Sequence, residues 1–141
     1  MIGIVLVTHG RLAEEFVAAT EHVVGPQEKM RTICIEPDDD MEARRRDILE
    51  AIDEVNDGSG VILLTDMFGG TPTNLALSLH EKDRIEIVTG VNLPMLIKFV
   101  NLRDTLSLHP AAGMIAEQGR EAIHVASDLL ATKQKRSGGT D

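Results

Sequence analysis

Short apolar runs alternate along this chain with longer segments in which apolar residues recur at helical spacing. Four runs rich in valine, isoleucine and leucine predict β-strands, at residues 2–8, 30–36, 61–65 and 85–89. Continuous apolar runs of this length are typical of strands buried on both faces of a parallel sheet. The pattern therefore favours an α/β fold that is doubly wound, with a mainly parallel sheet.

The segments between these runs predict helices. The first is expected to begin near Arg11 and to end at Gly25-Pro26, and the second to cover 41–55. Three aspartates, Asp38–Asp40, stand before the second helix, where carboxylates suit the positive end of the helix dipole. We interpret them as capping residues, because a calcium loop spaces its ligands at alternate positions and adds a distant glutamate. Later helices are expected around 75–79, over 95–100 and over 111–118.

The C-terminal part gives a weaker pattern. Over 122–126, Ile123 and Val125 alternate as in a strand, while the continuation to Leu130 fits a helix equally well. The polar residues 132–141 predict a flexible tail, which leaves residues 1–131 as one domain.

Composition narrows the possible functions. The net charge of −9, with no basic patch interleaved with aromatic residues, argues against nucleic-acid binding and suits a basic protein partner. Aromatic residues make up only 2% of the chain, which leaves little to stack a flavin, and we expect neither a cofactor nor a metal. The one cysteine, Cys34, lies in an apolar run and is expected to pack as a hydrophobe. Without a signal peptide or a long apolar run, we expect a cytoplasmic protein that does not insert into a membrane.

Two chemically distinctive positions each follow a predicted buried strand. His9 comes at the end of the first strand, and Asp66 follows the third. In open α/β sheets, ligands bind outside the carboxyl ends of the strands where the strand order reverses, and an order of 2-1-3-4 would place both residues there. A carboxylate bonded to one imidazole nitrogen would fix the tautomer and leave the other nitrogen as a nucleophile. Asp66 has a structural alternative that is compatible with this role, which is to accept the amide hydrogens of the following glycines.

The loop after Asp66 has the features of an anion-binding helix start. Gly69 and Gly70 allow backbone amides to approach a ligand, Thr71 is suited to the N-cap, and Pro72 fits the first helical position. Helix-start amides favour phosphate, so a phosphoryl group on His9 would need no metal. A Gly-Gly-Thr-Pro segment is nevertheless a common helix start.

Three strand-end segments together resemble the EIIA components of the mannose-type sugar phosphotransferase system (PTS). They are Val7-Thr-His-Gly10 with Leu12-Ala13, the block Asp66–Asn74, and Thr89-Gly-Val-Asn-Leu-Pro-Met95; Gly119-Arg-Glu121 is similar as well. The resemblance covers about residues 1–130. It departs from the family in modest ways: Arg11 follows Thr-His-Gly, Thr71 stands where some relatives have serine, and no B domain is fused.

The resemblance implies a phosphohistidine carrier that takes a phosphoryl group from the carrier protein HPr and passes it to an EIIB component for sugar uptake. His9 would carry the phosphoryl group and Asp66 would orient the imidazole. Gly10, Gly69, Gly70 and Thr71 would lie at the phosphoryl group. Family proteins have a sheet of order 2-1-3-4 with an antiparallel edge strand exchanged in a homodimer, which would be residues 122–127 here.

Three alternatives remain open. The chain could be a regulatory EIIA whose phosphorylation state signals to a kinase or transcription regulator, or the phosphodonor subunit of a dihydroxyacetone kinase. A histidine phosphatase is disfavoured, because it would need an arginine where Thr8 stands. The other four histidines, His22, His80, His109 and His124, lack a comparable setting and receive no role. The sugar cannot be inferred from this sequence.

Overall fold

A four-stranded parallel sheet forms the centre of the protein. The computed structural model describes residues 1–138, and its strands are β1 (Gly3–His9), β2 (Met30–Ile35), β3 (Val61–Thr65) and β4 (Ile85–Thr89). Their order is β2-β1-β3-β4, so the strand order reverses between β1 and β3. The prediction of a doubly wound, mainly parallel sheet with this order is therefore confirmed.

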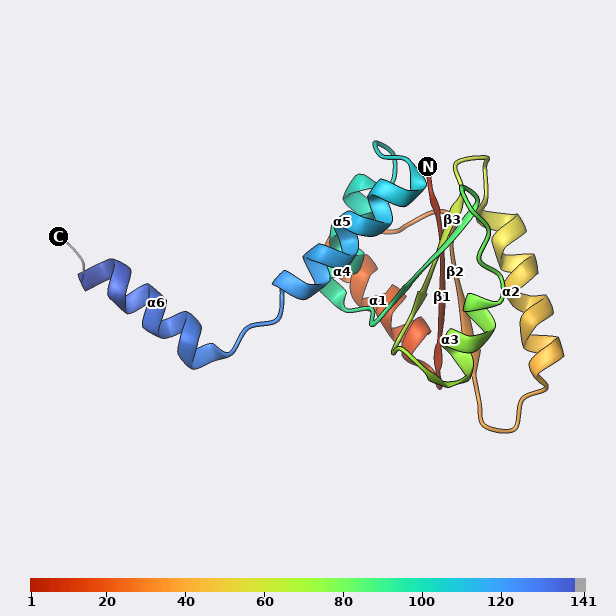
Figure 1. The fold of residues 1–141 in the computed structure, drawn as a ribbon, viewed down its shortest axis with the longest axis horizontal. Coiled ribbons are helices and arrows are strands. Elements are labelled where there is room, and N and C mark those ends of the chain that lie inside the picture. Colours follow the sequence, from red (N-terminus) through yellow and green to blue (C-terminus); the bar gives the residue numbers. More distant parts are fainter. Residues whose placement is uncertain (139–141) are drawn as a thin grey trace.

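Helices cover both faces of the sheet, as Figure 1 shows. They are α1 (Leu12–Val24), α2 (Met41–Val55), α3 (Gly70–Leu77), α4 (Leu93–Leu102), α5 (Leu108–Glu121) and α6 (Ala126–Gly138). One face packs against α1, α4 and α5, through a core that includes Leu6, Leu64 and Phe99. The other face packs against α2 and α3, through a core that includes Val5, Leu63 and Ile52. Two separate cores explain why the central strands β1 and β3 read as continuous apolar runs, since both of their faces are buried, whereas the edge strands β2 and β4 are partly exposed.

The largest shift from the predicted bounds is in α3, expected around 75–79 and found over Gly70–Leu77, and smaller shifts occur where a cap or a neighbouring strand sets the bounds. β1 begins and ends one residue later than predicted, which makes His9 its last residue, paired in register with Ile35 of β2. α4 begins earlier than predicted, because the side chain of Asn92 accepts a hydrogen bond from the amide of Met95 at 3.0 Å. The capping role predicted for the aspartate cluster is confirmed at Asp40, which accepts from the amide of Glu42 at 3.0 Å.

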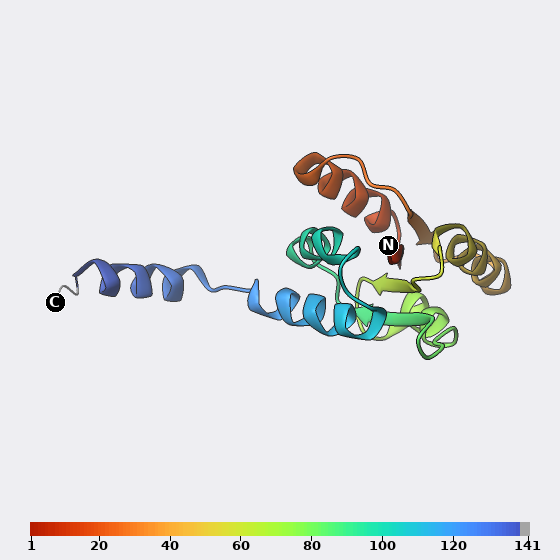
Figure 2. The same cartoon turned by 90° about the horizontal axis from the view of Figure 1, so that it is seen from above.

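The antiparallel edge strand expected over 122–127 is not formed in this single chain. Residues 123–125 have no regular structure, and α6 begins at Ala126. An edge strand needs a neighbouring strand to satisfy its backbone, whereas a helix satisfies its backbone internally. α6 extends away from the rest of the molecule, as Figures 1 and 2 show. α6 also continues past residue 131, where the domain was expected to end and the flexible tail to begin. Residues 139–141 of that expected tail lie outside the described residues.

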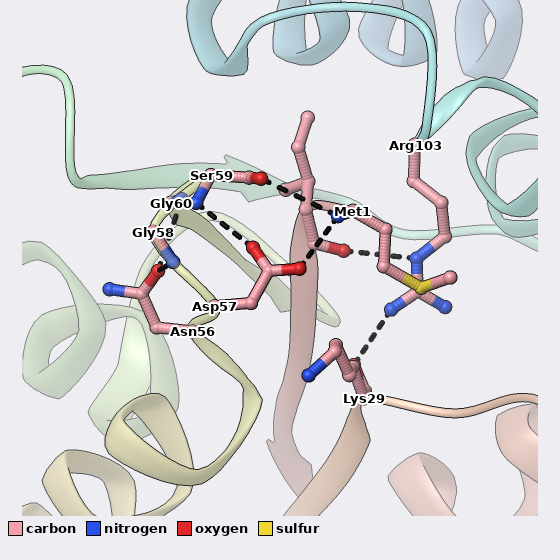
Figure 3. A network of polar contacts seen from close by, with 9 residues as sticks. Met1, Lys29, Asn56, Asp57, Gly58, Ser59, Gly60 and Arg103 are labelled. Atoms are coloured by element: carbon pink, nitrogen blue, oxygen red, sulfur yellow. Dashed lines mark hydrogen bonds and ion pairs between the residues drawn. The ribbon is translucent and has the colours of Figure 1, made fainter.

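A buried arginine holds the end of the sheet opposite His9. Arg103 is 2% exposed, and its guanidinium donates to the carbonyls of Ile2 and Lys29, both at 2.9 Å (Figure 3). Burial lowers the pKa of this guanidinium. Close by, the amino group of Met1 donates to Asp57 at 2.8 Å, and this bond, with others from Ser59, lowers the pKa of the Asp57 carboxyl. These contacts join the start of β1 to the turns before β2 and β3.

Cys34 lies on β2 and packs, partly buried, against the core that faces α1. Its predicted role as a small hydrophobe is confirmed. Within the part of the chain that the structure describes, no helix is both long and apolar enough to cross a membrane.

Candidate functional site

His9 and Asp66 meet at the carboxyl ends of β1 and β3, where the strand order reverses. Their positions differ by 57 residues in sequence, but Nδ1 of His9 lies 2.9 Å from Oδ2 of Asp66. The same carboxylate oxygen accepts the backbone N–H of His9 at 3.0 Å. Because a carboxylate only accepts hydrogen bonds, Nδ1 carries a proton and donates it, and in the neutral imidazole Nε2 then holds the free lone pair.

The two partners differ in exposure in a way that suits a reactive imidazole. The His9 side chain is 47% exposed, whereas the Asp66 side chain is only 10% exposed. The other carboxylate oxygen of Asp66, Oδ1, is buried and has no hydrogen-bond partner among the described residues. Among the described residues, the Asp66 carboxylate therefore has His9 as its hydrogen-bond partner, and it is placed to stabilise positive charge that develops on the ring during a reaction.

The first turn of α3 lies against the free edge of the imidazole. Gly70 has a φ of +83°, and a Cβ at this position would stand 3.2 Å from both Cε1 and Nε2 of His9. Gly69, with a φ of +94°, precedes the helix. The first amides of a helix have no intrahelical carbonyl to bond, so those of Gly70 and Thr71 are available to an acceptor beside Nε2.

A cavity of about 440 Å³ opens beside His9. It is lined by His9, Gly10, Ile35, Glu36, Pro37, Met41 and Thr71. Gly10 and Thr71, both predicted to lie at a bound phosphoryl group, therefore share a concave surface with the imidazole. Arg11 is not among the lining residues, and its guanidinium pairs with Glu14 at 3.1 Å.

Three details of the loop differ from the expectations. The N–H of Gly10 donates to the carbonyl of Ile35 at 2.9 Å, so Gly10 offers space instead of an amide. Thr71 is not the N-cap: the cap position falls at Gly69, without a side-chain hydrogen bond, because two glycines with positive φ let the helix begin earlier. Among the described residues, Asp66 receives no hydrogen bond from the glycine amides: Oδ2 accepts from His9, and Oδ1 has no partner.

Buried threonines, which the sequence reasoning missed, hold these loops in place. Thr73 bonds to Thr65 at 2.8 Å through their hydroxyls, and it also donates to the carbonyl of Met67. Thr8 accepts the amide of Ala13 at 2.8 Å and so fixes the start of α1. The available signal was a threonine at the end of an otherwise apolar strand, because a buried hydroxyl must find a partner.

Fold and site together define a doubly wound α/β domain with a carboxylate-paired histidine at its topological switch point. The model of the family described as "PTS system fructose IIA component" (EIIA-man) matches residues 3–116. The chain belongs to this family, and it is an EIIA component of the mannose family of the phosphotransferase system.

Relatives and solved structures agree with this assignment. The chain is 32% identical over 124 residues to the mannose-specific EIIAB component of Escherichia coli K12, covering 86% of this chain but only 38% of that relative. It is 24% identical over 131 residues to the fructose-specific EIIA component of Bacillus subtilis, covering 92% of this chain and 90% of the relative. The EIIA crystal structure from Streptococcus agalactiae superimposes with a TM-score of 0.81 at 26% identity, covering 91% of this chain and 99% of the other.

Proposed function

We propose that this chain is a phosphohistidine carrier of the cytoplasm, which accepts a phosphoryl group from phospho-HPr on His9 and passes it to an EIIB component for sugar uptake. The observation that carries the proposal is the bond between His9 Nδ1 and Asp66 Oδ2, at 2.9 Å. In the neutral ring this bond directs the proton to Nδ1 and leaves the Nε2 lone pair at an accessible surface, which is the state an attacking imidazole needs. Family membership supports the same chemistry.

The phosphoryl group can pass from one imidazole to the other without a metal or a general base. Nε2 of His9 forms a bond to phosphorus as the phosphorus–nitrogen bond of the donor breaks, and the donor imidazole leaves with that electron pair. His9 keeps its proton on Nδ1 and gains positive charge, which the Asp66 carboxylate stabilises. Because a nitrogen–phosphorus bond replaces another, the step is reversible, and the carrier can pass the group onward.

The surroundings of Nε2 suit the charge on a transferring phosphoryl group. The first-turn amides of α3 and the hydroxyl of Thr71 would bind its oxygens, and Gly70 would leave room for it. Phosphoryl transfer depends mostly on positioning and electrostatic stabilisation, which these groups provide.

Exposed apolar side chains beside the site favour protein partners over a small substrate. Leu12, Met67 and Phe68 lie in the segments that follow β1 and β3, and Phe68 is 78% exposed. Apolar side chains grouped at a reactive residue are typical of a docking surface. HPr and an EIIB component are the partners that the family membership supports.

We also propose that the protein is a homodimer in which residues 122–127 form an antiparallel strand beside β4. Among the named strands only β3 pairs with β4, and on the other side Glu81 bridges β4 at Ile85, which leaves the edge open beyond that residue. Ile123 and Val125 are exposed, as are Leu129 and Leu130. An unpaired edge and an apolar segment of matching length are complementary, and pairing would bury both.

Incubation with phosphoenolpyruvate, enzyme I and HPr tests the carrier assignment. Wild type is expected to gain one acid-labile phosphate, and His9→Gln is expected to gain none. His22→Gln, an exposed histidine in the last turn of α1, is the matched control and should label like wild type. Failure of the wild-type chain to label would reject the carrier function, while label persisting in His9→Gln would reject the site. Adding EIIB or a dihydroxyacetone kinase then shows which acceptor discharges the label.

A further inference from the structure

The cavity beside His9 has an apolar floor and one carboxylate. Ile35, Pro37 and Met41 supply apolar surface, and Glu36 supplies the carboxylate. Glu36 is exposed, and its side chain has no hydrogen bond or ion pair among the residues that the structure describes. The cavity thus combines a surface for a hydrocarbon stem with an uncompensated negative charge.

The backbone of Glu36 is held in place even though its side chain is unpaired. Its N–H donates to the side chain of Asp39 at 2.9 Å, and its carbonyl accepts the N–H of Asp39 at 3.2 Å. β2 ends at the preceding residue, Ile35, whose carbonyl is bonded by Gly10. The carboxylate therefore projects from a fixed turn directly beside the His9 segment.

The residues that line the cavity carry a negative charge, and none of them carries a positive charge that could offset a phosphoryl group. None of the seven lining residues is lysine or arginine, and the nearby Arg11 is engaged with Glu14. A phosphoryl group on His9 would add further negative charge next to Glu36. Glu36 and a phosphoryl group on His9 would be two anionic groups flanking an apolar cavity, which attract a cation that none of the seven lining residues supplies.

We propose that this cavity receives a lysine or arginine side chain of the protein that donates the phosphoryl group. The hydrocarbon stem would lie on Ile35, Pro37 and Met41, while the cationic head would lie between the Glu36 carboxylate and the transferring phosphoryl group. Long cationic side chains bury their stems along apolar surface and keep the charged end in a polar setting. The inference rests on the proposed carrier function, and it identifies Glu36 as a residue that selects the partner.

Transfer kinetics with two donors test this inference. The rate of His9 phosphorylation is measured with phospho-HPr and with phosphoramidate, a small donor that has no side chain to place in the cavity. The variants are Glu36→Gln and Glu36→Lys. The control is Glu28→Gln, which removes the same charge from an exposed glutamate beyond the other end of β2.

With phospho-HPr, Glu36→Gln is expected to lower kcat/KM about three- to ten-fold, mainly through KM, and Glu36→Lys is expected to lower it further. The difference from wild type should shrink at high salt, because exposed charges are screened. The loss is expected with phospho-HPr and not with phosphoramidate, and Glu28→Gln should behave as wild type with both donors.

Two results would overturn the inference while the carrier function stands. Equal kinetics of Glu36→Gln and Glu28→Gln with phospho-HPr would show that no cation is recognised by Glu36. An equal loss with both donors would show that Glu36 acts on His9 and not on the partner. Failure of wild type to label with either donor would instead reject the carrier function, and the inference with it.

Discussion

A single carboxylate oxygen sets the state of the reactive imidazole. Oδ2 of Asp66 accepts both Nδ1–H and the backbone N–H of His9, so it fixes the ring and the strand end together. In the proposed transfer this oxygen would make two separate contributions: its position would orient Nε2, and its charge would stabilise the positive imidazole that forms on phosphorylation.

Two substitutions at Asp66 separate those contributions. Asp66→Asn retains an acceptor oxygen but loses the charge, and it is expected to slow His9 phosphorylation about 10-fold. Asp66→Ala loses both, and the expected loss is on the order of 100-fold. Single-turnover phosphorylation measures the rates, and circular dichroism checks that both variants are folded. Rates equal to wild type in both variants would remove Asp66 from the mechanism.

At Cys34, burial raises the pKa of the thiol above its ordinary value of 9.0. A raised pKa leaves less thiolate at any pH below it, and the thiolate is the nucleophile. Alkylation by iodoacetamide at pH 8 is therefore expected to be slower in the folded protein than in the chain unfolded in urea. Because this is the chain's one cysteine, mass spectrometry reports its adduct directly. Equal rates in both states would contradict the prediction.

At the scale of elements, the start of α3 places Nε2 beside helix-start amides. Gly69 and Gly70 both have positive φ, and sparsely populated backbone conformations of this kind cost a residue with a side chain on the order of 1–3 kcal/mol. They differ in their surroundings, since a Cβ on Gly70 would stand 3.2 Å from Nε2 of His9, while one on Gly69 would meet nothing within 4 Å.

This difference makes Gly69→Ala a matched control for Gly70→Ala. Both variants are expected to lose on the order of 1–3 kcal/mol of unfolding free energy, measured in urea. Only Gly70→Ala should also slow His9 phosphorylation strongly, because its methyl group would occupy the space in front of Nε2. Comparable slowing in both variants would point to a general disturbance of the loop and not to a contact with the imidazole.

At the scale of the whole molecule, the C-terminal arm is incompletely packed in the single chain. α6 projects away from the body in both views (Figures 1 and 2), and Val125, just before it, is 64% exposed. A second copy of the chain would bury this surface against the open edge of β4.

Sedimentation equilibrium tests the proposed dimer. Val125→Asp places a charge in the segment that would pair with β4, and it is expected to shift the protein to monomer. Glu121→Gln, at the end of α5, alters a neighbouring exposed residue without adding a charge and should remain as associated as wild type. A wild-type chain that sediments as monomer at micromolar concentration would reject the dimer.

Much of this architecture follows from local pattern. The bounds of β3 and β4 agree with the prediction: β3 is buried along its whole length, and β4, at the edge of the sheet, keeps enough apolar residues to be recognised although Glu86 interrupts the run. The ends of α4 and the register that makes His9 the last residue of β1 depend on side-chain caps and on β2, so they could not be located from periodicity. The strand or helix choice at 122–127 depends on whether another strand is available, which a single sequence does not show.

The sequence by itself determined where the buried strands lie, the α/β class, and that a histidine and an aspartate stand at the carboxyl ends of two strands. These features depend on the local pattern of apolar and polar residues, which can be read along the chain. Only the tertiary structure decided that one oxygen of Asp66 serves both donors of His9, that Gly10 has no free amide, and that Glu36 borders the reactive cavity. These are distances between segments far apart in the chain, and they arise when the sheet brings its strand ends together.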